Sequence, residues 1–131
     1  MTEQQTITEF ITARLDEDHY RAYQAQGLLG IPTPWWTWRH LRNRFGTSIT
    51  HADALHIGHH GPARVLREVE AKRAILELAD EATGLDMSVD IDRGIGPRDK
   101  AAEPYVGDLI IRQMAQAYSD HPDYNPEWSI T

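Results

Sequence analysis

The sequence predicts a mainly helical α+β fold, in which three helices pack around a long central helix and a small β-hairpin lies at one end. An apolar stripe at helical spacing runs without interruption over residues 62–83. Two further segments, 8–25 and 104–118, show the same period, and a tryptophan-rich segment alternates like a strand. At 131 residues, we expect the chain to form a single domain over residues 1–131.

The first expected helix covers residues 8–25. Thr6 and Glu9 match a capping box, in which the threonine hydroxyl and the glutamate side chain satisfy free amide groups at the start of a helix. Gly27 follows as a helix stop. The apolar residues fall on one face of this helix, and they are Ile7, Phe10, Ile11, Leu15 and Ala22.

A Trp-containing hairpin is expected over residues 35–57. Pro32 and Pro34 disfavour a helix just before it. By alternation Trp36 and Trp38 share one face of a strand over 35–42, which turns near residues 43–46 into a second strand over 47–57. A helix over residues 36–44 is the competing interpretation.

The central helix is expected over residues 62–83. Pro62 suits the first helical position, where its missing N–H has no intrahelical partner to lose. Gly84 is placed to end the helix as the residue after its C-cap. A helix of this size would be about 33 Å long.

The remaining third of the chain alternates between loops and one helix. Residues 85–103 are expected to form a loop, within which Met87, Val89 and Ile91 alternate with polar residues like a short edge strand. A helix over 104–118 follows. The end, 119–131, is expected to be a latch that folds its aromatic residues back over the central helix.

The composition excludes several classes of function. The chain has no cysteine, so disulfides, thiolate metal sites and cysteine nucleophiles are excluded. It shows no apolar run long enough for a membrane span and no signal peptide, so we expect a cytoplasmic protein. The net charge is −7, yet residues 35–76 carry seven basic and three acidic residues, or +4. No nucleophile motif or phosphate-binding loop is present, which favours a protein that is not an enzyme.

Aromatic and cationic residues gather in the Trp-containing segment. Such a group is typical of a protein-binding hot spot, where Trp and Arg are enriched. Stacking on nucleic-acid bases is an alternative that the acidic net charge opposes, and simple burial of the tryptophans is another. The residues expected to bind a partner are Trp35, Trp36, Arg39, Arg42 and Arg44.

A histidine pair precedes the central helix. If the segment were helical, His56 and His60 would lie one turn apart and could share a metal ion such as zinc. The pair needs at least a third ligand, and Gly58 and Gly61 argue against a regular helix. The alternative is that these histidines only hydrogen-bond the first turn of the helix, in which case no cofactor is expected.

Two stretches of the chain resemble hallmarks of a family of small uncharacterised proteins from actinobacteria and their phages. The stretches are HIGHHGPARVLREVEAKRAIL, residues 56–76, and YSDHPDYNPEW, residues 118–128. Members of that family often have Asp where Gly61 stands and cysteines near the position of Asp108, which this chain lacks. The resemblance implies that a structural zinc site built with those cysteines would be lost or differently liganded here.

The resemblance implies no activity and carries over no catalytic residue. Together with the patterns above, it leads us to expect a cytoplasmic accessory protein, related to phages, that binds an unidentified host or phage protein. Zinc binding at His56 and His60 is the alternative function, and nucleic-acid binding through the Trp/Arg segment is the second alternative. The sequence predicts no oligomeric state.

Overall fold

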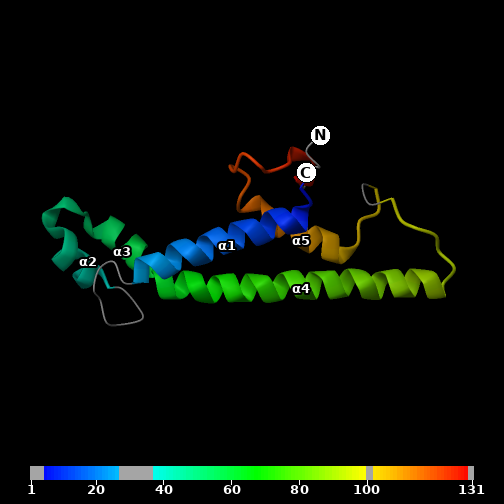
Figure 1. The fold of residues 1–131 in the computed structure, drawn as a ribbon, viewed down its shortest axis with the longest axis horizontal. Helices are drawn as coiled ribbons and strands as arrows, with labels where there is room; N and C mark the ends of the chain where they lie inside the picture. Colours follow the sequence, from blue (N-terminus) through cyan, green and yellow to red (C-terminus); the bar gives the residue numbers. More distant parts are fainter. Residues whose placement is uncertain (1–4, 27–36, 100–101, 130–131) are drawn as a thin grey trace. The chain divides into compact units, whose positions relative to one another are not determined.

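The fold is entirely helical in the part of the chain that the structure describes. A computed structural model describes residues 5–26, 37–99 and 102–129. It contains five α-helices, α1 (Ile7–Gln26), α2 (Trp38–Phe45), α3 (His51–His59), α4 (Pro62–Asp92) and α5 (Val106–Gln116), and two short 3-10 helices (Gly46–Ser48 and Pro126–Trp128) (Figure 1). No strand occurs in these ranges, so the expected α+β class is wrong.

The predicted hairpin over 35–57 is replaced by α2, a 3-10 turn and α3. Thr37 caps α2: its hydroxyl accepts a hydrogen bond from the His40 amide, and the imidazole of His40 accepts one from the Thr37 amide. Thr50 caps α3 by accepting a bond from the Asp53 amide. These local caps satisfy amide groups that a strand would have to pair with another strand. Trp35 and Trp36, which the sequence predicts to bind a partner, lie outside the described residues.

The predicted edge strand around Met87 is also absent, because α4 continues through Gly84 to Asp92. The residue that stops the helix is Gly94, two positions after Asp92, and its φ of +71° favours glycine. The Gly94 amide bonds to the Ile91 carbonyl, and the Ile95 amide bonds to the Asp90 carbonyl. This pair of bonds is a Schellman motif, which closes a helix where the chain turns away.

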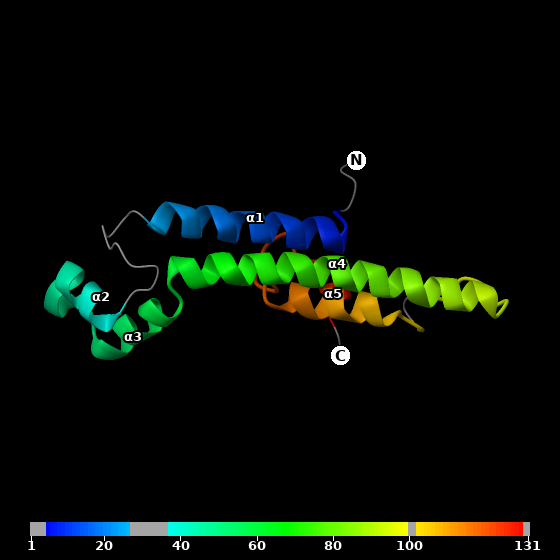
Figure 2. The ribbon, with the colours of Figure 1, turned by 90° about the horizontal axis from the view of Figure 1, so that it is seen from below.

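The chain divides into two compact units, which we describe separately. The first unit comprises residues 1–14 and 72–131, and the second comprises residues 15–71. In the first unit, the buried residues come from the beginning of α1, the second part of α4, α5 and the residue before α5. These helices are labelled in Figures 1 and 2. The buried residues include Phe10, Ile11, Ala79, Tyr105, Ile111 and Ala115.

Phe10 anchors the aromatic cluster of the first unit. Its ring is fully buried, and the centroid of the Trp128 ring lies 5.1 Å away. Tyr124 and His121 meet the same ring edge-on at 6.0 and 5.7 Å. The aromatic rings of the C-terminal segment therefore pack against Phe10 of α1, whereas the sequence predicted a latch over the central helix.

Helices α4 and α5 approach closely at Gly107. A Cβ at this position would lie 2.0 Å from the carbonyl oxygen of Ala79 and 2.1 Å from the Thr83 hydroxyl. Only glycine allows the two helix backbones this separation. The contact fixes where α5 crosses α4 in the first unit.

The second unit contains α2, α3 and the adjoining parts of α1 and α4. Its buried apolar residues include Leu15, Ala22, Leu41, Ala54 and Val69. None of the helices that the structure describes combines the length and the apolar character needed to traverse a lipid bilayer.

Candidate functional site

The first candidate site is the surface of α2. Trp38 and Phe45 lie two turns apart on one side of this helix, and they are 36% and 46% exposed. Leu41, which lies between them in the sequence, is completely buried. Helix α2 thus keeps one aliphatic anchor inside and presents its aromatic rings at the surface.

Arginines frame these aromatic rings. The guanidinium of Arg39 lies 5.7 Å from the centre of the Trp38 ring, and that of Arg44 lies 5.8 Å from the Phe45 ring. Both distances fall within the range of cation–π attraction. Arg42, one turn from Trp38, is exposed as well. We call Trp38, Phe45, Arg39, Arg42 and Arg44 the α2 surface.

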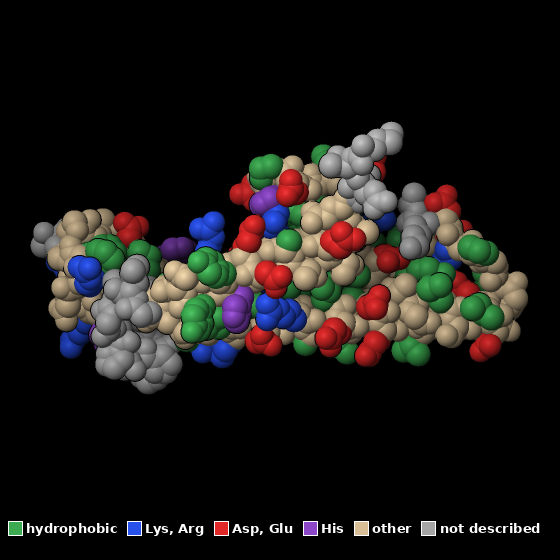
Figure 3. Space-filling model, viewed as in Figure 1, with side chains coloured by type: hydrophobic (Ala, Val, Ile, Leu, Met, Phe, Trp, Pro, Cys, Tyr) green, Lys and Arg blue, Asp and Glu red, His purple; other side chains and the backbone are tan. Residues whose placement is uncertain are grey.

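Helix α3 packs beside α2 and contacts the α2 surface. The ring of His51, the first residue of α3, meets Trp38 edge-on at 4.9 Å. Leu55 on α3 is 49% exposed and adds apolar area. In Figure 3 blue basic and green apolar side chains lie close together over the α2–α3 region, where red acidic atoms also appear. Further red acidic side chains are spread over α1 and α4.

The histidine pair forms a second candidate site. Helix α3 is regular through Gly58, contrary to the sequence argument, and it places His56 and His60 with ring centroids 4.8 Å apart. Both rings line an open cavity of about 360 Å³, to whose lining α1 contributes Asp18, Arg21 and Ala22. No group of three or more His, Asp or Glu side chains suited to a metal ion occurs in the described ranges.

The surroundings of His60 disfavour its charged form. Desolvation lowers the pKa of His60 from its ordinary value of 6.5, and the neighbouring His56, Arg64 and His59 lower it further. A neutral imidazole is the form that ligates a metal ion. His59 plays a different part, because Arg64 donates to its ring and to its carbonyl oxygen and also pairs with Glu68 at 2.8 Å. That chain of contacts joins the end of α3 to the first turns of α4.

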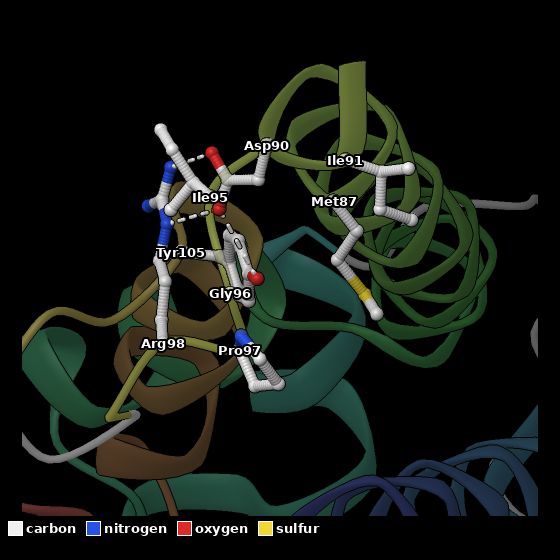
Figure 4. A pocket seen from close by; sticks show the side chains of 8 residues that line it. All are labelled: Met87, Asp90, Ile91, Ile95, Gly96, Pro97, Arg98 and Tyr105. Atoms are coloured by element: carbon white, nitrogen blue, oxygen red, sulfur yellow. Dashed lines mark hydrogen bonds and ion pairs between the residues drawn. The ribbon is translucent and has the colours of Figure 1, made fainter. Parts of the chain in front are cut away.

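A third site lies at the end of α4 and was missed by the sequence argument. Asp90 is only 5% exposed, and its carboxylate accepts two hydrogen bonds from Arg98, at 2.7 Å from Nε and 3.0 Å from Nη2 (Figure 4). The Tyr105 hydroxyl donates to the same carboxylate at 3.4 Å. The Arg98 guanidinium also lies 4.3 Å from the centre of the Tyr105 ring.

This cluster shifts the pKa values of all three groups. The hydrogen bonds from Arg98 are the main cause that lowers the pKa of Asp90, against the opposing effect of burial. The pKa of Arg98 is raised by the same bonds. Burial, followed by the charge of Asp90, raises the pKa of Tyr105. At neutral pH the site is therefore a closed ion pair with a neutral phenol beside it.

The cavity beside this cluster is small and mostly apolar. Its volume is about 230 Å³, below the usual range for small-molecule sites, and Met87, Ile91, Ile95 and Pro97 supply apolar walls. Each polar group of the cluster already bonds to another member. The arrangement is suited to holding the loop after α4 in place, and it offers no unpaired group for chemistry.

A match along nearly the whole chain relates it to a known family. A model of one family matches residues 4–130. The chain belongs to DUF6221, a family of unknown function. No curated protein and no solved structure matches this DUF6221 chain significantly. The match establishes the family of the chain. An origin in actinobacteria or their phages stays a prediction from the sequence resemblance.

Proposed function

We propose that this DUF6221 protein is an accessory protein that acts by binding a host or phage protein through the α2 surface. The observation that carries the proposal is the partial exposure of Trp38 and Phe45 beneath the guanidinium groups of Arg39 and Arg44. Aromatic side chains and Arg are enriched at the centres of protein interfaces. Rings held by cation–π contacts also lose little conformational freedom when a partner covers them.

Charge indicates what kind of partner fits. Helix α2 carries three arginines and no acidic residue, while the chain as a whole has a net charge of −7. Repulsion from the rest of the molecule disfavours polyanions such as nucleic acids, which need many phosphate contacts. An acidic protein segment would be attracted by the arginines, and an apolar side chain on it could pack on Trp38 or Phe45. Such a segment is therefore complementary to both the charge and the aromatic rings of the α2 surface.

The test is capture with the full chain as bait, followed by measured affinity for the captured protein. Trp38→Ala and Arg42→Ala should each weaken binding at least tenfold, because hot-spot truncations cost about 2 kcal/mol or more. Exposed residues elsewhere serve as matched controls: Tyr23→Ala on α1 and Arg93→Ala after α4 should bind like the wild type. Circular dichroism checks that every variant keeps its helices.

The controls also separate the competing outcomes. A partner whose affinity is unchanged by Trp38→Ala and Arg42→Ala binds elsewhere and contradicts the proposal. Tight, salt-sensitive binding of a single-stranded oligonucleotide would instead support nucleic-acid recognition by the same arginines.

Metal binding by His56 and His60 is the second candidate function. It is favoured by the convergence of the two rings, 4.8 Å apart, on the cavity lined by Asp18. Two imidazoles leave a zinc ion two or more ligands short, so we expect weak binding completed by water. Zinc titration of untagged protein tests this: saturable binding that His56→Gln and His60→Gln abolish supports the site. Binding that both variants retain rules it out.

A further inference from the structure

Helix α4 carries a second apolar face, beside the one that it buries. Along this face the residues recur at alternating steps of three and four. The exposed fractions of its larger side chains are 41% for Ile75, 62% for Leu78, 69% for Leu85 and 47% for Val89, and Ala82 completes the series. We call Ile75, Leu78, Ala82, Leu85 and Val89 the α4 stripe.

The α4 stripe lies away from the helix's own packing. Buried Val69 falls on the other side of the helical wheel, and buried Ala79 and Asp90 fall beside the stripe and not on it. In Figure 2 no described segment passes in front of this stretch of α4, and Figure 3 shows apolar side chains at its lower edge among acidic ones. Alternating steps of three and four over about 21 Å of helix are the pattern of a coiled-coil seam.

We propose that the α4 stripe binds the α4 stripe of a second copy of this chain, with the two helices antiparallel. A seam of this period packs best on a helix that carries the same period, and the chain itself supplies one. A two-fold axis brings identical patches together, which is the commonest arrangement in soluble oligomers.

Side-chain size fits one register of this pairing. With the helices antiparallel, Ile75 lies opposite Leu85 of the second copy, and Leu78 lies opposite Ala82 of the second copy. Symmetry repeats each layer, so four apolar layers form from these residues. Each Leu78 meets a small partner, which lets the two helices approach closely while large side chains fill the outer layers.

Charges that flank the stripe favour the antiparallel direction. In this register Lys72 faces Asp86 of the second copy on one flank, and symmetry makes two such attractive pairs. Glu81 faces its own equivalent across the axis, which is one repulsive pair. In a parallel pair, Glu81 would instead face Asp86 of the second copy twice, and both contacts would be repulsive.

The first experiment measures the mass of the full chain against concentration by sedimentation equilibrium. We expect a reversible shift from the 14.9 kDa monomer to twice that mass. Leu85→Glu should weaken the dimer at least tenfold. Ile91→Glu is the matched control, because Ile91 lies on the same helix and is 72% exposed but falls outside the stripe. A monomer at every concentration up to the millimolar range, or equal effects of the two variants, overturns the proposal.

The second experiment decides the direction of the helices. Asp86→Lys should weaken the dimer by at least threefold, and adding Lys72→Glu should restore it, because the attractive pair is rebuilt with reversed signs. Glu81→Gln should strengthen the dimer, whereas the exposed Glu77→Gln should not. Strengthening by Asp86→Lys alone would show a parallel pair and overturn the proposed arrangement. Circular dichroism confirms that each variant is folded.

Discussion

At the scale of single residues, Asp90 joins the end of α4 to the residues that follow it. It closes the Schellman end of α4 through its carbonyl oxygen and binds Arg98 and Tyr105 through its carboxylate. Arg98 lies eight residues away and Tyr105 fifteen, so neither is its neighbour at helical spacing. No periodicity in the sequence could predict this cluster, because only the turn at Gly94 brings the three side chains together.

The lowered pKa of Asp90 predicts a pH dependence of stability. A group whose pKa is lower in the folded state stabilises the fold above its unfolded pKa, about 3.9 for Asp, and loses that contribution as the pH falls through the folded value. At pH 7 the free energy of unfolding of the wild type should therefore exceed that of Asp90→Asn. This difference should shrink below about pH 4.

Urea unfolding at several pH values measures this difference. Asp92→Asn is the control, because Asp92 is exposed at the end of the same helix and should change stability by less than about 0.5 kcal/mol. A difference between wild type and Asp90→Asn that stays constant from pH 7 to pH 3 would show that charge on Asp90 does not stabilise the fold.

At the scale of helices, Gly107 and Gly84 form a matched pair. A Cβ at Gly107 would overlap the Ala79 carbonyl, whereas a Cβ at Gly84 would meet nothing within 4 Å. Gly107→Ala should destabilise the protein by about 1–3 kcal/mol, the usual cost of overpacking. Gly84→Ala should stabilise it by about 1 kcal/mol, because alanine is the better helix former.

Thermal or urea unfolding of both variants checks these signs. Stabilisation by Gly107→Ala would mean that α5 does not pack on α4 as closely as described. Helix propensity alone predicts the same sign for both substitutions, so opposite signs isolate the contribution of the interhelical contact.

The sequence predicted the helices with strong periodicity, but it failed where local capping decided the structure. The segments expected at 8–25, 62–83 and 104–118 correspond to α1, α4 and α5, with shifted bounds. The hairpin prediction is wrong because Thr37 and Thr50 cap helices in a segment where Trp36 and Trp38 alternate as they would in a strand. The acidic Asp53 three positions after Thr50 was an available signal for a helix start. His40, three positions after Thr37, is not the Glu or Gln of the usual capping box, so the sequence signal there was weaker.

Glycine explains the remaining error at this scale. Gly84 and Gly94 are equally good stop signals by residue type, yet only Gly94 adopts a positive φ. The two glycines differ in the residue that comes next in the chain. After Gly94, Ile95 lies beside apolar side chains of the last turns of α4, whereas after Gly84, Leu85 continues the helix. Pattern alone does not contain this difference.

At the scale of the whole molecule, the two compact units predict two separable responses to core substitutions. Phe10→Ala removes the centre of the aromatic cluster in the first unit and should cost about 3–5 kcal/mol. Amide hydrogen exchange should accelerate most in α5 and in residues 118–128. The amides of α2 and α3, in the second unit, should change less.

The reciprocal variant completes this prediction. Leu41→Ala should cost about 2–5 kcal/mol and should accelerate exchange mainly in α2 and α3. Equal acceleration throughout the chain in both variants would show that the two units open only as one cooperative structure.

The continuity of α1 and α4 has a practical meaning for anyone who wishes to divide this protein. The boundaries of the second unit, at residues 15 and 71, both fall inside helices and not in loops. A shortened clone that encoded either part would therefore start or stop in mid-helix, with carbonyl and amide groups stripped of their partners. We expect truncations to yield insoluble material, so that reliable work on this family starts from intact polypeptide.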